Sequence, residues 1–145
     1  MREIETVLEE IGKGGDLERV FRTKSWQSFE EFVSWIFEKH DFATRLRFRF
    51  GEEKREIDVL ATRGEIIIAA ECKKWRGRSF SPSRLRQVAK VHEEKCGKLA
   101  SLFGRNVVPV VVTLLDSGIL KEGGVFFVPL FKLNSFLLEI DRFIR

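Results

Sequence analysis

The chain has 145 residues, of which 43% are hydrophobic and 33% are charged, a balance that excludes a disordered or fibrous protein and fits one globular domain. Its longest apolar run, residues 107–115, is far too short to span a membrane, and its two cysteines exclude a disulfide framework and a paired-cysteine zinc site. The net charge of +4 hints at an anionic partner, and the acidic start without an apolar signal segment predicts a cytoplasmic protein.

The chain opens with a short amphipathic helix and a glycine-rich joint. Apolar residues recur at helical spacing as far as Ile11, and the sequence Gly-Lys-Gly-Gly at residues 12–15 then interrupts the pattern. We therefore predict an N-terminal helical arm over residues 1–24 and one folded domain over residues 25–145.

The domain begins with a predicted helix that starts at Ser25 or Ser28 and ends near His40. Apolar residues lie three and four positions apart along it, which is typical of a helix with one wide buried face. These positions are Trp26, Phe29, Phe32, Val33, Ile36 and Phe37.

Three strands are predicted next, as an antiparallel meander. Residues 43–50 alternate between basic and apolar side chains, so they form a strand with its basic residues on one face. Those basic residues are Arg45, Arg47 and Arg49. Residues 56–62 and 65–73 form the second and third strands, and a tight turn at Arg63 and Gly64 joins them.

The second half of the chain adds a helix, two strands and a closing helix. Ser81 followed by Pro82 is typical of a helix start. The apolar run at 110–115 predicts a strand buried on both faces, and a short strand at 125–128 and a helix at 133–143 follow. Together the elements predict an α/β fold, with helices flanking a mixed sheet that combines the antiparallel meander with a parallel strand.

The residues that indicate chemistry lie in the predicted hairpin. Glu71 and Lys73 are two residues apart in one strand, so they share a face. Given the predicted turn, Asp58 lies opposite Ala69 on that same face and is a diagonal neighbour of Glu71, roughly 7–8 Å away at the backbone. Two such carboxylates can share one Mg²⁺, and Lys73 beside it can hold or polarise a water. Because the surroundings of Glu71 are apolar, its charge must be paired or metal-bound, and the residues alone leave a buried ion pair and a metal site equally open.

Six segments, taken in order, resemble the catalytic domain of Mrr-type restriction endonucleases, which belong to the PD-(D/E)XK nuclease superfamily. They are SFEEFVSWIFEKHDF (28–42), EIDVLA (56–61), ECKKW (71–75), LRQV (85–88), VPVVVTL (108–114) and VPLFKLNSFL (128–137). The first and third segments are also similar to archaeal Holliday junction resolvases. The resemblance implies a restriction-endonuclease-like fold and a DNA endonuclease, restriction-like or structure-specific, that uses Mg²⁺, which Mn²⁺ can replace.

The same resemblance implies roles for the motif residues. Asp58 and Glu71, with the backbone carbonyl of Cys72, would hold the metal ion, and Lys73 would be the catalytic lysine. Ile57 stands where this superfamily often has a proline before the aspartate.

Two further residues match positions that assist catalysis in such nucleases. Glu30 would be the outer acid that binds a second metal ion or its waters; it lies at the edge of the apolar stripe, whereas Glu31 points to solvent. Gln87 matches a glutamine that helps to place the phosphate.

Basic residues cluster next to the predicted carboxylates. Between Lys73 and Lys90 there are seven basic residues and no acid, with Trp75 and Phe80 among them. Such side chains hold DNA phosphates without reading sequence. The predicted DNA-binding residues are Lys74, Arg76, Arg78, Arg84, Arg86, Arg45 and Arg47.

We therefore expect DNA as a partner and no membrane contact, and a homodimer is one expected assembly because related nucleases often dimerise to cut both strands. Two other functions stay open at this stage. One is a non-catalytic DNA-binding module or a subunit of a larger DNA-processing complex; the other is an interaction domain whose basic face meets an acidic protein. Metal binding and DNA cleavage would separate an endonuclease from both.

Overall fold

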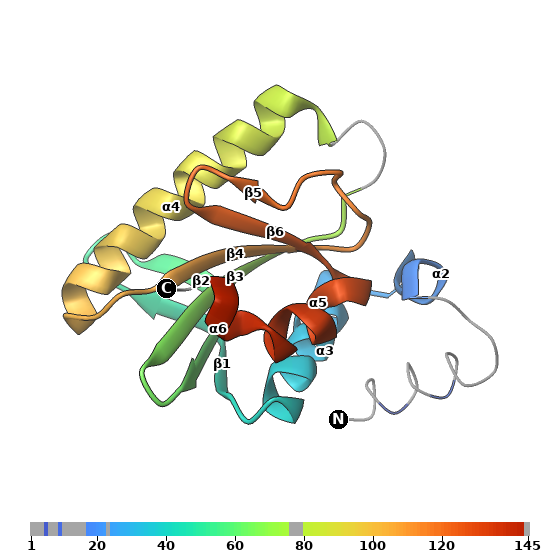
Figure 1. The fold of residues 1–145 in the computed structure, drawn as a ribbon, viewed down its shortest axis with the longest axis horizontal. Coiled ribbons are helices and arrows are strands. Elements are labelled where there is room, and N and C mark those ends of the chain that lie inside the picture. The colour runs from blue at the N-terminus through green and yellow to red at the C-terminus, as the bar shows by residue number, and fades with distance from the viewer. Residues whose placement is uncertain (1–4, 6–8, 10–16, 23, 76–79, 144–145) are drawn as a thin grey trace.

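The computed structural model describes residues 5, 9, 17–22, 24–75 and 80–143. In these residues a mixed sheet carries helices on both of its faces (Figure 1). The strands are β1 (Ala43–Phe50), β2 (Arg55–Arg63), β3 (Ile66–Lys73), β4 (Val108–Thr113), β5 (Lys121–Glu122) and β6 (Val125–Pro129). The helices are α2 (Leu17–Arg22), α3 (Trp26–Lys39), α4 (Pro82–Phe103), α5 (Leu130–Leu138) and α6 (Ile140–Phe143).

The sheet has the order β1-β2-β3-β4-β6-β5. β1, β2 and β3 are paired antiparallel as a meander, β4 lies parallel to β3 and to β6, and β5 closes the edge antiparallel to β6. The predicted α/β fold with a mixed sheet is confirmed. Of the strands described, only the two-residue β5 was not predicted, since it is too short to leave a pattern of alternation; the helix α2 was not predicted, and the one closing helix predicted is divided into α5 and α6.

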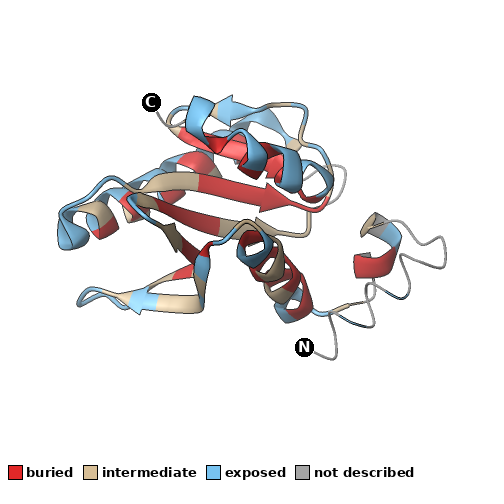
Figure 2. Ribbon diagram, turned by 60° about the horizontal axis from the view of Figure 1, so that its bottom comes forward, coloured by how far each residue is buried: buried red, intermediate tan, exposed pale blue. Residues whose placement is uncertain are grey.

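The helices cover the two faces of the sheet unequally. α3 and α5 pack on one face, where residues such as Phe29 and Leu133 meet Ile68 and Ala70 of β3. α4 alone covers the β2–β3 part of the other face, where Leu99 meets Ala69. Figure 2 shows the buried residues in the central strands and on the sides of the helices that face them. Because successive side chains of a strand alternate, the acid and lysine that end β3 lie on the α4 side.

The short helix α2 belongs to this core. Phe21 is completely buried, and its ring lies 5.6 Å from that of Phe29 and 5.3 Å from that of Phe32, both in α3. The arm predicted over residues 1–24 therefore contributes at least one segment to the core of the domain. The amphipathic helix predicted before it lies outside the described residues.

The two longest helices begin at the predicted signals. Ser25 is the N-cap of α3, and its Oγ accepts a hydrogen bond from the backbone N–H of Ser28 at 3.2 Å. Ser81 caps α4, which ends at Gly104 in the left-handed conformation with φ of 65°. Among the helices described, none combines the length and apolar character needed to cross a membrane.

Candidate active site

Asp58 faces Glu71 across the β2–β3 hairpin. The paired register runs from Arg63 opposite Ile66 to Val59 opposite Ala70, and Asp58 and Glu71 come directly after this last pair. The predicted pairing of Asp58 with Ala69 is therefore wrong, because the turn lies one residue later, at Gly64, whose φ of 58° suits glycine, and its successor. The shift of two residues leaves Leu60 and Ala69 on the α4 side, but β2 reverses its faces at Asp58, since Ile57 packs on the α4 side and Val59 on the α3 side.

The Asp58 carboxylate is held by the neighbouring strand. Its Oδ2 accepts a hydrogen bond of 2.8 Å from the backbone N–H of Cys72 in β3. Burial, followed by the charge of Glu71, raises the pKa of Asp58 to about 6, against the lowering effects of that N–H and of Lys95 and Lys73. A second carboxylate thus lies close enough to make the ionised form of Asp58 costly.

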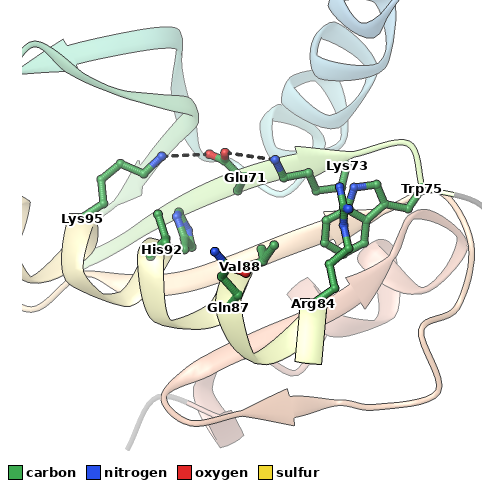
Figure 3. A pocket seen from close by; sticks show the side chains of 9 residues that line it. Glu71, Lys73, Trp75, Arg84, Gln87, Val88, His92 and Lys95 are labelled. Carbon is green, nitrogen blue, oxygen red and sulfur yellow. Dashed lines mark hydrogen bonds and ion pairs between the residues drawn. The ribbon is translucent and has the colours of Figure 1, made fainter. Parts of the chain in front are cut away.

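Glu71 lies between two lysine side chains (Figure 3). Its Oε1 is 3.2 Å from the Nζ of Lys95 in α4, and its Oε2 is 3.8 Å from the Nζ of Lys73 in β3. Lys95 was not among the predicted site residues. The sequence gives only its place in the predicted helix, three residues after His92 and next to Cys96, at the border of the apolar face.

Glu30 lies on the α3 side of the site and is only 3% exposed. Its Oε1 accepts a hydrogen bond of 2.6 Å from Nη1 of Arg47 in β1. Burial and the charge of Asp58 raise the pKa of Glu30 to about 7, although Arg47 acts in the opposite direction. Glu30 therefore does lie near the predicted carboxylates, but an arginine already contacts one of its oxygens.

Arg47 interrupts the alternation of β1. It has a φ of 52°, in the left-handed region that side chains other than glycine rarely adopt, and no pair with β2 is formed at its position. Leu46 packs on the α3-side cluster and Phe48 on the α4-side cluster. The prediction that Arg45, Arg47 and Arg49 share one face is therefore wrong, because the strand reverses its faces at Arg47.

The predicted metal site rests on two carboxylates. No group of three or more His, Cys, Asp or Glu side chains placed to hold a metal ion occurs within the described part of the chain. The pair formed by Asp58 and Glu71 still fits Mg²⁺, which is bound through one or two carboxylates and keeps several waters. One oxygen of Asp58 is held by the N–H of Cys72, and one oxygen of Glu71 is held by Lys95. The raised pKa of Asp58 indicates that its negative charge is costly there, and a bound cation would reduce that cost.

A pocket of about 350 Å³ opens between β3 and α4 beside Glu71. Lys73, Gln87 and Arg84 contribute polar groups to its wall, and the Arg84 guanidinium lies over the ring of Trp75 at 5.2 Å. Gln87 is exposed and lies in this wall, as Figure 3 shows, so the predicted glutamine does reach the neighbourhood of the motif.

The other predicted DNA-binding residues are distributed as follows. Lys74 donates a hydrogen bond to the backbone carbonyl of Lys24, which ties the end of β3 to the segment before α3. Arg86 is exposed on α4, and Arg45 is exposed on β1 with its guanidinium 5.8 Å from the ring centre of Phe48. Arg76 and Arg78 lie outside the described residues.

The raised pKa of Glu30 has a measurable consequence for stability in the metal-free protein. Between pH 4.5, its ordinary pKa, and about 7, its pKa in the fold, the folded protein keeps a proton that the unfolded chain has lost. The free energy of unfolding therefore falls as the pH rises through this window, by on the order of 3 kcal/mol for a shift of this size. Asp58 adds a fall in the same direction.

We expect Glu30→Gln to show a shallower fall than the wild type in urea unfolding from pH 4 to 8 with EDTA. His92, whose pKa burial lowers, acts in the opposite direction but equally in both proteins, so the difference isolates Glu30. Parallel profiles for the two proteins would show that Glu30 is not protonated in the fold.

Comparisons with known proteins bear on this arrangement. Residues 21–102 match the model of a restriction endonuclease family, that of the Mrr catalytic domain. An uncharacterized protein of Archaeoglobus fulgidus is 36% identical over 121 residues, which are 82% of this chain and 94% of that protein. The small subunit of a heterodimeric restriction endonuclease superposes with a TM-score of 0.53 over 94% of this chain and 79% of its own, at 16% identity.

Proposed function

Because the chain belongs to the restriction endonuclease family of the Mrr catalytic domain, we propose that it is a divalent-metal-dependent DNA endonuclease, restriction-like or structure-specific in its choice of substrate. The observation that carries the proposal is the placement of Asp58 beside Glu71, directly after the last pair of the β2–β3 register, with Lys73 on the same strand and 3.8 Å from the Glu71 carboxylate. A carboxylate pair can hold the metal ion that phosphodiester hydrolysis uses, and a lysine beside it can orient the attacking water. The structural neighbour supports the same fold.

In this proposal each side chain of the site has its own role. Asp58 and Glu71, with the carbonyl of Cys72, would hold Mg²⁺ or Mn²⁺, which when bound supplies Lewis-acid stabilisation of the phosphate and lowers the pKa of a coordinated water. Lys73 would orient the attacking water and hold positive charge beside the phosphate. Gln87, at the pocket wall, would place the phosphate.

Glu30 would act beside this pair, either on a second metal ion or, through its 2.6 Å hydrogen bond, on Arg47. The second role is the one that its present contact supports. In that role Glu30 fixes the orientation of the Arg47 guanidinium, and Arg47 would contact a DNA phosphate.

DNA is the proposed substrate because cations surround the site. The chain carries 26 lysine and arginine residues against 22 acids. Of the predicted phosphate contacts, Arg84 lies at the pocket, Arg86 is exposed on the same helix, and Arg45 and Lys74 lie on β1 and after β3. Contacts of this kind give affinity and orientation, and they weaken as salt is raised.

The proposal is tested by incubating the protein with supercoiled plasmid and with branched DNA, each with Mg²⁺, Mn²⁺ or EDTA. We expect nicked or linear product with either metal and none with EDTA, because the carboxylate pair would have no cation to position. Catalysis would be refuted by intact DNA in every metal condition, and metal dependence by equal cleavage in EDTA.

The second candidate is a non-catalytic DNA-binding module or a subunit of a larger DNA-processing complex, and the structural neighbour, which is the small subunit of a heterodimeric enzyme, favours membership of a complex. This candidate predicts salt-sensitive DNA binding without Mn²⁺ binding or cleavage. Calorimetric titration of Mn²⁺ into the protein separates the two, and light scattering tests whether the chain forms the expected homodimer.

A further inference from the structure

We infer that Lys95 is a positioning residue of the carboxylate pair: it fixes the orientation of Glu71 and so decides which oxygen is open to a divalent cation. This inference rests on the proposed function and assigns a residue from α4 to the carboxylate pair, whose two acids come from β2 and β3. The motif resemblance gives no role to this position.

Lys95 is anchored by two strands at once. Its Nζ donates to Oε1 of Glu71 in β3 at 3.2 Å and to the backbone carbonyl of Glu56 in β2 at 2.9 Å. Its side chain is only 13% exposed, which is unusual for lysine. Ordering such a long side chain costs conformational entropy, so the two acceptors must compensate for it, and the ammonium is fixed in place.

The two lysines beside Glu71 are not equivalent. Lys73 lies 3.8 Å from Oε2, beyond hydrogen-bond distance, and its side chain is 32% exposed. Lys95 is closer, more buried and doubly bound. Lys73 is therefore free to reach substrate or water, while Lys95 acts through Glu71.

With Lys95 in place, Asp58 and Glu71 are held in the same way, each through one of its two oxygens. Asp58 uses Oδ2 to accept the N–H of Cys72, and Glu71 uses Oε1 to accept Lys95. Each acid is thus held by one oxygen, and among the described residues no hydrogen bond fixes Oδ1 of Asp58 or Oε2 of Glu71. Groups that orient ligating carboxylates in this way typically raise metal affinity 10–100-fold.

A simpler role for Lys95, that of neutralising Glu71, predicts the opposite sign. If the ammonium only supplied charge, its removal would free the carboxylate and strengthen the binding of a cation. If it positions Glu71, its removal lets the carboxylate rotate and weakens that binding. Metal affinity measured without DNA therefore decides between the two.

The experiment is calorimetric titration of Mn²⁺ into the full chain, with thermal unfolding as a check on folding. We expect Lys95→Met to bind Mn²⁺ about 10–100-fold more weakly than the wild type. Lys95→Gln, which keeps an N–H donor without the charge, is expected to fall between them. Lys98→Met is the matched control one turn along α4, where Lys98 pairs with the exposed Glu53 at 3.0 Å, and it should stay within about twofold of the wild type.

Binding by Lys95→Met that equals or exceeds that of the wild type overturns the inference, and if Lys95→Met does not fold, the same result with Lys95→Gln overturns it. A wild type that binds no Mn²⁺ removes the proposed metal dependence and this inference together. A wild type that binds Mn²⁺ and loses it in Asp58→Asn, but not in Lys95→Met, leaves the proposed function standing and refutes only the role of Lys95.

Discussion

Exchange of Asp58 for asparagine is expected to lower metal-dependent DNA cleavage by on the order of 10³-fold while leaving the metal-free fold at least as stable as the wild type. Asparagine keeps a side-chain oxygen that can accept the 2.8 Å hydrogen bond from Cys72, but it lacks the charge that a cation requires. It also removes the charge whose burial, followed by repulsion from Glu71, raises the pKa of Asp58 to about 6, so the folded state no longer carries that cost. A loss of activity without a loss of stability distinguishes a functional acid from a structural one.

The measurement combines initial rates of plasmid cleavage with urea unfolding in EDTA at pH 8. Lys73→Met is expected to lose cleavage as well, with a smaller effect on Mn²⁺ binding than Asp58→Asn. Asp141→Asn on α6, an exposed acid far along the chain, is the matched control and should cleave at the wild-type rate. Undiminished cleavage in both Asp58→Asn and Lys73→Met would remove the site altogether.

The parts of this site that could be predicted are those governed by short-range rules. The two-residue period of β3 fixes Glu71 and Lys73 on one face regardless of the turn. The hairpin between β2 and β3 brings Asp58 next to the end of β3, where it accepts a hydrogen bond from Cys72, although the predicted register was wrong by two residues. The parallel strand β4 followed from its continuous apolar run, since it is buried on both faces.

The parts that could not be predicted depend on the approach of distant segments. Lys95 reaches Glu71 only because α4 packs over β3, 24 residues away in sequence, and a lysine in an amphipathic helix normally indicates solvent. Arg47 interrupts the alternation of β1 because its φ is left-handed, and the sequence gives no sign of this, since the residue is not a glycine. The regular spacing of the arginines predicted a strand with unbroken alternation. In the structure the strand is irregular at Arg47, and there Arg47 contacts the buried Glu30.

Exchange of Phe21 for alanine is expected to destabilise the domain by about 3–5 kcal/mol, although this residue lies in the segment that the sequence indicates as an appended arm. The ring of Phe21 is completely buried and contacts the rings of Phe29 and Phe32, which belong to the helix that carries Glu30. Phe131→Ala on α5 is the matched control, because its ring is 59% exposed and its removal should change the free energy of unfolding by no more than about 0.5 kcal/mol.

Urea unfolding followed by circular dichroism measures both variants under one set of conditions. Because α2 packs on the first turns of α3, the loss of Phe21 should also loosen the helix that places Glu30 and the exposed Trp26 beside Arg47, whose guanidinium lies 5.9 Å from the Trp26 ring centre. Cleavage by Phe21→Ala should therefore decline at temperatures below its unfolding transition. Equal stability of Phe21→Ala and Phe131→Ala would instead show that the segment before residue 25 is an appendage, and that the domain folds from α3 onwards without it.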